Sequence, residues 1–257
     1  MSALQHWQAE AIWEAMQPLL PGFTVEVLPS IDSTNTELMR RARAGQLDPI
    51  LLVAEQQTAG RGRLGRQWQS EGPADGAGLT FSLGLPLAPR NWSGLSLAVG
   101  VSVAESLHPD LRLKWPNDVW LKDRKLAGIL IETASFGSVR YVVIGIGINI
   151  TPRDAAGLAT PPAWLQEVQP GLNAPQTLQR LMPTLVPTLL HFESHGFAPF
   201  HRRFCALDVL AGRVVKLSDG TEGVAKGVDE DGALLLQTAT GMQKITSAEV
   251  SVRPTSD

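Results

Sequence analysis

The chain has 257 residues, 44% of them hydrophobic and 18% charged, which is typical of a globular protein with one sizeable domain and a small one. A formal net charge of −3 argues against a global basic field that would hold DNA, and the single cysteine, Cys205, excludes an intrachain disulfide. The N-terminus carries Glu10 and Glu14 and no long apolar run, so we expect neither a signal peptide nor a membrane span and place the protein in the reducing cytoplasm.

Apolar periodicity predicts a succession of helices and strands. Residues 4–20 are expected to form an amphipathic helix that ends before Pro21. Thr34 is expected to cap a second helix, with Glu37 three residues later completing a capping box and Gly45 ending the helix. Further strands are predicted over residues 23–27, 49–55, 79–85, 111–115, 126–132 and 141–148, and further helices over residues 92–107, 177–191 and 197–204.

The order of these elements indicates the fold class. Several strands are joined by tight turns, at residues 122–124 and near Gly137, whereas the helices are gathered elsewhere. This favours an α+β fold with a mixed, largely antiparallel sheet over a doubly wound one. A long Pro-, Ala- and Gly-rich connection is expected over residues 152–175, and short, regularly spaced strands from about residue 211 predict a small β-barrel.

The segment from Gly60 to Arg66 alternates three glycines with three arginines and is followed by Trp68. Glycine allows a ligand to approach the backbone closely, and the arginine guanidinium matches the geometry of phosphate oxygens. The pattern therefore indicates a loop that binds a polyphosphate or a phosphoanhydride. The alternative is a solvated basic loop that contacts RNA.

A second polar segment begins at Lys114 and continues through Pro116 to Asp118. Proline cannot donate to a sheet ladder, so Pro116 is expected to end a strand and to leave Asn117 and Asp118 at a turn facing a ligand. Lys125 starts the next strand and supplies a second cation. Lysine can place a point charge on a phosphate, and aspartate can hold Mg²⁺ beside phosphates. A purely structural Asp118 is the alternative.

Together these segments resemble those of biotin–protein ligases (biotin–[acetyl-CoA-carboxylase] ligases). The matching stretches, which cover most of the chain, are residues 32–36, 55–66, 114–118, 124–132 and 145–149, with weaker matches at 223–232 and 249–253. The resemblance implies a class II synthetase-like catalytic domain over residues 1–210 and an SH3-like domain over residues 211–257. Two features depart from the family. Ala248 stands where a glycine is usual, and only 32 residues precede Ser33, so we expect a short form without an N-terminal DNA-binding domain.

The resemblance also implies a reaction. Biotin attacks the α-phosphorus of ATP with the help of Mg²⁺, and a lysine of a biotin carboxyl carrier protein then attacks the acyl carbon of biotinyl-5′-AMP. The implied catalytic residues are Lys125 and Arg63, and Asp118 is a candidate Mg²⁺ ligand. The implied biotin-binding residues are Ser33, Thr34, Asn35, Gln57, Arg61, Gly62, Arg63 and Lys125. The implied nucleotide-binding residues are Arg66, Trp68, Lys114, Asn117, Asp118, Gly147 and Asn149.

Other functions remain to be separated from this one. A lipoate–protein ligase shares the fold and the two-step chemistry, and a repressor that senses biotinyl-AMP would use the same pocket. Helix capping alone is an alternative role for the polar residues 33–35. The five histidines lie outside every motif and are interpreted as structural or surface residues. A homodimer is compatible with the sequence.

Overall fold

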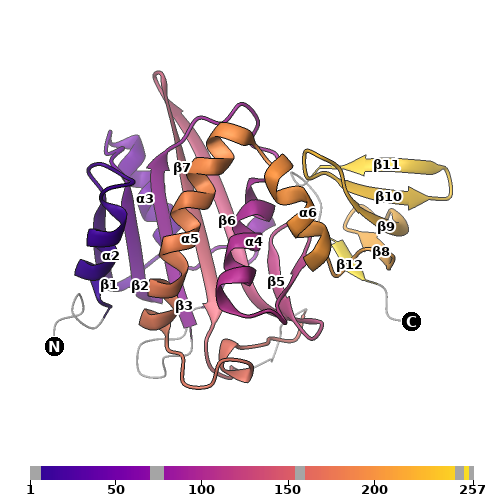
Figure 1. The fold of residues 1–257 in the computed structure, drawn as a ribbon, viewed down its shortest axis with the longest axis horizontal. Coiled ribbons are helices and arrows are strands. Elements are labelled where there is room, and N and C mark those ends of the chain that lie inside the picture. Colours follow the sequence, from indigo (N-terminus) through magenta and orange to yellow (C-terminus); the bar gives the residue numbers. More distant parts are fainter. Residues whose placement is uncertain (1–6, 70–77, 154–159, 247–251, 255–257) are drawn as a thin grey trace.

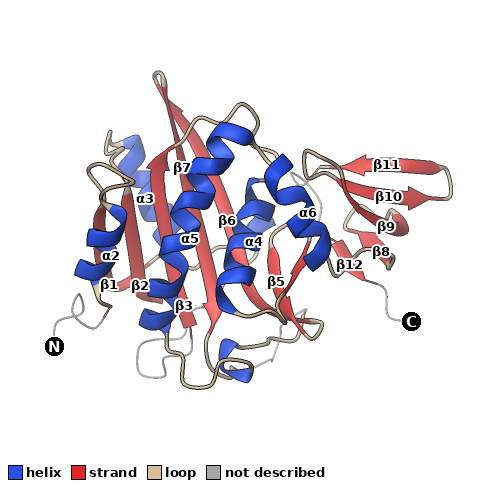
Figure 2. Cartoon of the chain, viewed as in Figure 1, coloured by secondary structure: helices blue, strands red, loops and turns tan. Residues whose placement is uncertain are grey.

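The computed structural model describes residues 7–69, 78–153, 160–246 and 252–254. Its larger layer is a seven-stranded sheet in the order β1-β2-β3-β7-β6-β5-β4 (Figures 1 and 2). The strands are β1 (Thr24–Ile31), β2 (Ile50–Gln57), β3 (Gly78–Pro86), β4 (Arg112–Lys114), β5 (Asp118–Leu121), β6 (Arg124–Phe136) and β7 (Val139–Asn149). β1 and β2 are parallel and the other neighbours are antiparallel, so the predicted mixed, largely antiparallel sheet is confirmed.

Helices cover both faces of this sheet because alternate strand residues point to opposite sides. Leu51 and Val53 of β2 belong to the main core, whereas Leu52 packs with Leu38 and Met39 on the other face. The main core lies under the helices α2 (Ala9–Met16), α4 (Leu95–Leu107), α5 (Ala174–His195) and α6 (Ala198–Leu207). The second face is covered by α3 (Thr34–Arg43), seen behind the sheet in Figure 1. The helix α3 lies beside the segments predicted to bind ligand.

A second, antiparallel sheet follows α6 and has the strand order β11-β10-β9-β8-β12. Its strands are β8 (Val214–Leu217), β9 (Glu222–Val228), β10 (Leu234–Thr238), β11 (Gly241–Ile245) and β12 (Val252–Pro254). The Trp115 indole donates to the carbonyl of Gly232, and the Asn91 amide donates to Asp231. These bonds attach the small sheet to connections next to the larger sheet, and Figure 1 shows the small sheet beside α6.

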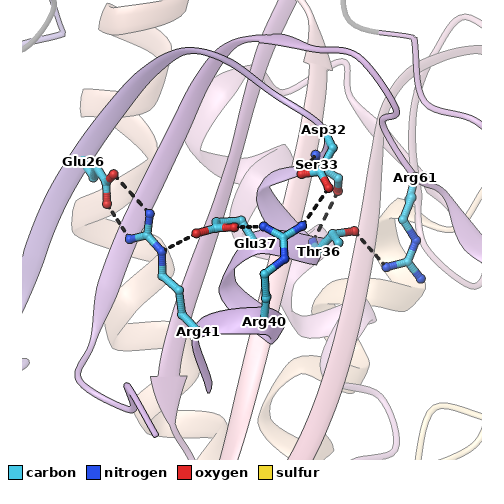
Figure 3. A network of polar contacts seen from close by, with 8 residues as sticks. All are labelled: Glu26, Asp32, Ser33, Thr36, Glu37, Arg40, Arg41 and Arg61. Carbon is cyan, nitrogen blue, oxygen red and sulfur yellow. Dashed lines mark hydrogen bonds and ion pairs between the residues drawn. The ribbon is translucent and has the colours of Figure 1, made fainter. Parts of the chain in front are cut away.

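Several expectations are corrected by the structure. The first helix spans Ala9–Met16, shorter than the predicted 4–20, although residues 4–6 lie outside the described part. Ser33 and not Thr34 caps α3, because the Ser33 hydroxyl accepts from the backbone of Thr36. Glu37 makes no capping box; it pairs with the arginines at positions 40 and 41, as Figure 3 shows.

Three strands were not predicted, namely β5, β11 and β12. Asp118 was expected at a turn but begins β5, because only three residues separate β4 from β5. β11 is Gly-Met-Gln-Lys-Ile, whose polar positions hide the alternation that identifies a strand. In the long connection after β7, residues 165–167 form one turn of 3-10 helix, and residues 154–159 lie outside the described part. No helix among the described residues is long and apolar enough to cross a membrane.

Candidate active site

The predicted site residues come from distant parts of the chain, and most of them line one pocket. It lies between the start of α3, the arginine-rich loop of residues 60–68, and strands β5, β6 and β7. The predicted residues that line it are Ser33, Thr34, Asn35, Gln57, Arg61, Gly62, Arg63, Arg66, Trp68, Lys114, Asn117, Asp118, Lys125 and Gly147. Asn149 lines the adjoining cavity, which shares Arg66, Trp68 and both lysines with the first.

One end of the pocket is a buried network of neutral polar groups. The backbone N–H of Thr34 donates to Gln57 Oε1 at 2.8 Å, and the Thr34 hydroxyl lies 3.1 Å from the same oxygen. The hydroxyl of Ser82, which is fully buried on β3, lies 2.7 Å from Thr34 Oγ1 and 2.6 Å from Asn35 Oδ1. Ser33 is also buried, so its capping role leaves it within the pocket lining. These groups suit a small ligand that both donates and accepts hydrogen bonds.

The other end of the pocket gathers positive charge around one carboxylate. Asp118 Oδ1 lies 2.7 Å from Lys125 Nζ, and Asp118 Oδ2 lies 3.9 Å from Lys114 Nζ. Burial lowers the pKa of Lys114 to about 8, although Asp118 partly offsets this shift. Arg63 donates to Asn117 Oδ1 at 3.3 Å, and burial lowers its pKa as well. An anion with several oxygens would relieve this concentration of desolvated cations.

Trp68 lines both of these cavities. A Cβ added to Gly147 would lie 2.3 Å from the Trp68 ring, so only glycine permits the indole to rest on β7. Lys125 Nζ is 5.9 Å and the Arg153 guanidinium 6.0 Å from the centre of an aromatic ring of Trp68, within the range of cation–π attraction. The backbone N–H of Trp68 donates to Gly60, which fixes the base of the loop.

Three residues that the sequence analysis assigned no role are built into this site. Ser82 completes the polar network, Glu132 contacts Asn35 and Arg61, and Arg153 joins Gln69 to Asn149. Ser82 and Glu132 contact Asn35, which lies 47 and 97 positions away from them in the sequence. A local sequence pattern therefore could not reveal that these two residues belong to the site.

Two further predicted site residues, Arg61 and Asn149, also contact other parts of the protein. Arg61 forms a bidentate pair with Glu132, at 3.0 and 3.3 Å. It also donates to Thr36 Oγ1, and Figure 3 shows this contact. The Asn149 amide donates to the carbonyls of Lys125 and Ala163, and its Oδ1 accepts from Arg153. Asn149 therefore holds the strand that carries Lys125 close to the connection after β7.

The oxygen ligands that the pocket offers limit how the expected Mg²⁺ could be bound. Asp118 is the only carboxylate among the described residues that line the pocket, and two lysines already face it. The described part of the chain contains no cluster of three acidic, histidine or cysteine side chains that could hold a metal ion. Such a site fits Mg²⁺ only as a companion of phosphate oxygens, with water completing its coordination.

Comparison with known proteins identifies the family. Residues 27–149 match the model of the biotin/lipoate A/B protein ligase family, and residues 212–253 match that of the biotin protein ligase C-terminal domain. The bifunctional ligase/repressor BirA of Escherichia coli (strain K12) is 39% identical over 247 residues, which are 91% of this chain and 75% of that protein. The chain belongs to the biotin–protein ligase family.

Further relatives agree with this assignment. The biotin–[acetyl-CoA-carboxylase] ligase of Paracoccus denitrificans is 33% identical over 87% of this chain and 98% of its own length. A structure of the Aquifex aeolicus biotin protein ligase in complex with biotin and ATP superposes with a TM-score of 0.75 at 30% identity, covering 90% of this chain and 99% of that one. The predicted resemblance to biotin–protein ligases is thus confirmed.

Proposed function

We propose that this protein activates biotin with ATP to form biotinyl-5′-AMP and transfers the biotinyl group to a lysine of a biotin carboxyl carrier protein. The observation that carries the proposal is the arrangement of one pocket, in which a neutral polar end adjoins a cluster of desolvated cations. A carboxylate oxygen of biotin attacks the α-phosphorus of ATP, and the bond to pyrophosphate breaks. The amine of the carrier lysine then attacks the acyl carbon and expels AMP.

Positioning and charge stabilisation account for both steps, because neither requires a covalent bond to the protein. We assign the biotin rings to the end formed by residues 33–35 and Gln57, which Ser82 supports from beneath the pocket surface, and the biotin carboxylate to the region of Arg63 and Lys125. The triphosphate then extends toward Lys114 and Arg66, and Trp68 offers its face to adenine. Arg61, Gly62, Asn117, Gly147 and Asn149 complete the proposed binding surfaces.

We place Mg²⁺ with the nucleotide in this proposal. Asp118 would supply one oxygen once phosphate oxygens draw Lys125 and Lys114 away from it. The metal would neutralise charge that builds up on the leaving pyrophosphate. The reaction is placed in the cytoplasm because ATP is available there and the single cysteine suits a reducing compartment.

Exchange of labelled pyrophosphate into ATP tests the first step. Exchange should require biotin and should not be supported by lipoate, since lipoate lacks the ureido group that the polar end is proposed to recognise. Exchange that depends on lipoate alone would refute the proposal in favour of a lipoate–protein ligase. Mass spectrometry of a purified carrier domain incubated with the protein, biotin and ATP tests the second step.

A repressor function is the second candidate, and it is favoured by the likeness to BirA of Escherichia coli, whose name includes repressor activity. We propose that this chain does not bind DNA, because its net charge is −3. A gel-shift assay with and without biotin and ATP tests this. Light scattering under the same conditions tests whether the protein forms a homodimer.

A further inference from the structure

Glu132 is the residue in this structure that joins the polar end of the pocket to the arginine-rich loop. It lies in the middle of β6 with its side chain 24% exposed. Its Oε2 accepts from the Asn35 amide at 3.0 Å and from Arg61 Nη1 at 3.3 Å, while its Oε1 accepts from Arg61 Nη2 at 3.0 Å. One carboxylate therefore contacts two residues that are predicted to bind biotin.

The contact with Asn35 determines which atom of that side chain can meet a ligand. Both hydrogens of the Asn35 amide are directed to acceptors, the Leu130 carbonyl at 3.2 Å and Glu132 Oε2. The Asn35 carbonyl oxygen lies 2.6 Å from the Ser82 hydroxyl. A carboxamide has two donor hydrogens and two acceptor lone pairs, so one acceptor lone pair is left. Asn35 can therefore accept from an N–H of the ligand but cannot donate to it.

Two further observations show that this orientation is enforced. Turning the carboxamide over would place its oxygen against the Leu130 carbonyl and the Glu132 carboxylate, both of which repel it. Asn35 is 3% exposed, and a Cβ at Gly145 would lie 2.1 Å from its Oδ1, so the side chain fits against β7 only because residue 145 is glycine. Asn35 is thus held by strands on both of its sides.

The contact with Arg61 attaches the loop to the same carboxylate. Arg61 follows Gly60 at the start of the loop, and its backbone pairs with Gln67 across the loop in an isolated β-bridge. An isolated exposed pair contributes little to stability, but this one shares its acceptor with a buried amide and is bidentate. Glu132 therefore connects the loop to the residue that faces the ligand.

We propose that Glu132 is a positioning residue for biotin use: it fixes the Asn35 carboxamide as an acceptor and holds the loop of residues 60–68 over the bound ligand through Arg61. This inference rests on the proposed function and adds a residue and a role to it. Arg61 then acts through Glu132 as the attachment of the loop, and Arg63 is left to face the reacting groups.

Two substitutions separate the two contacts. Glu132→Ala removes both, and we expect the biotin dissociation constant measured by calorimetry without ATP to rise about tenfold, because an Asn35 carboxamide that is free to turn forgoes about one hydrogen bond to the ligand. The KM for ATP in pyrophosphate exchange should change by less than about twofold, because the bonds of Trp68 to Gly60 and of Gly62 to Arg66 still hold the part of the loop that faces ATP. Glu132→Gln retains an acceptor for Asn35 but loses the charge that holds Arg61. Its biotin affinity should fall by only about threefold, while trypsin cleaves the loop of the biotin-saturated protein about fivefold faster than in the wild type.

Glu105→Gln is the matched control, because Glu105 forms a bidentate pair with Arg203 between α4 and α6, outside the pocket. It should behave as the wild type in all three measurements. The proposal is overturned if both Glu132 variants bind biotin within about twofold of the wild type, or if the KM for ATP rises as much as the biotin dissociation constant. A wild-type protein without biotin-dependent exchange would refute the proposed function itself, whereas an active wild type with unaffected Glu132 variants would refute only the positioning role.

Discussion

Gly145→Ala should weaken biotin binding without disturbing the nucleotide end of the pocket. The added methyl group would lie 2.1 Å from Asn35 Oδ1, 2.9 Å from its Cγ and 3.3 Å from its Nδ2. Ordinary carbon contacts are 3.4 Å or longer, and β7 cannot retreat because it pairs with β3 on one side and β6 on the other. The Asn35 carboxamide must therefore leave its place.

The size of the effect follows from the hydrogen bond to biotin that a displaced Asn35 cannot make. Its contacts with Ser82, Leu130 and Glu132 are three hydrogen bonds in a buried setting. These three bonds exist with and without ligand, so their loss lowers the stability of the fold. Biotin binding loses the hydrogen bond that Asn35 is proposed to accept from the ligand, and one such bond left unmade in a buried site costs about 2 kcal/mol. This corresponds to a roughly thirtyfold increase in the biotin dissociation constant.

Calorimetric titration with biotin in the absence of ATP measures this change directly. Gly78→Ala is the control, since a Cβ there meets only the Ile148 carbonyl at 3.5 Å. Gly147→Ala, two residues along the same strand, should instead displace Trp68 and raise the KM for ATP. A folded Gly145→Ala protein whose biotin affinity stays within about threefold of the control would refute the reasoning, because the overlap would then have been absorbed elsewhere.

Three other predictions concern the charged end of the pocket. Lys125→Ala should slow adenylate formation about a hundredfold, equivalent to about 3 kcal/mol of transition-state stabilisation, and should weaken biotin binding far less. Stopped-flow measurement of adenylation checks this, and near-normal rates would remove Lys125 from the mechanism. Arg63→Gly should release biotinyl-5′-AMP faster, so that bystander albumin becomes labelled; unlabelled albumin in the presence of adenylate would contradict the assignment. Because burial lowers the pKa of Lys114 to about 8, the free protein loses that charge as pH rises through 8, and ATP affinity should fall between about pH 7 and 9. Binding near pH 8 should take up protons, and Lys114→Arg should abolish both effects; an unchanged pH profile in Lys114→Arg would exclude Lys114.

The parts of the site that consist of consecutive residues could be predicted from the sequence. The arginine-rich loop and the segment from Lys114 to Asp118 stand out because glycine, arginine and proline impose local conformations and charges. The structure brings both segments to one pocket, and Gln57 lies at the end of its strand as predicted. The roles assigned to these residues toward biotin and ATP stay predictions.

The remaining parts of the site depend on long-range packing. Capping illustrates the limit, because Ser33 and Thr34 are both good capping residues and only the backbone path decides between them. The path places Thr34 against Gln57, 23 positions away, so that Ser33 caps the helix. Glu132 lies in a matching sequence stretch, but its contacts with Asn35 and Arg61 arise only when the strands assemble into the sheet, so the sequence did not predict them. The C-terminal motif residues 248–251 lie outside the described part of the chain.

Trp115 shows how the small sheet and the pocket depend on each other. Its side chain is fully buried, and its indole N–H donates to the Gly232 carbonyl in a turn of the small sheet. That turn is packed closely, since a Cβ at Gly232 would lie 2.8 Å from the Cα of Gly94 at the start of α4. Trp115 is also the neighbour of Lys114, and the next carbonyl, that of Pro116, accepts from Ser96 on α4. A displacement of the small sheet must therefore move the backbone that carries Lys114, so the C-terminal unit affects the charged end of the pocket even where its own side chains do not reach the ligand.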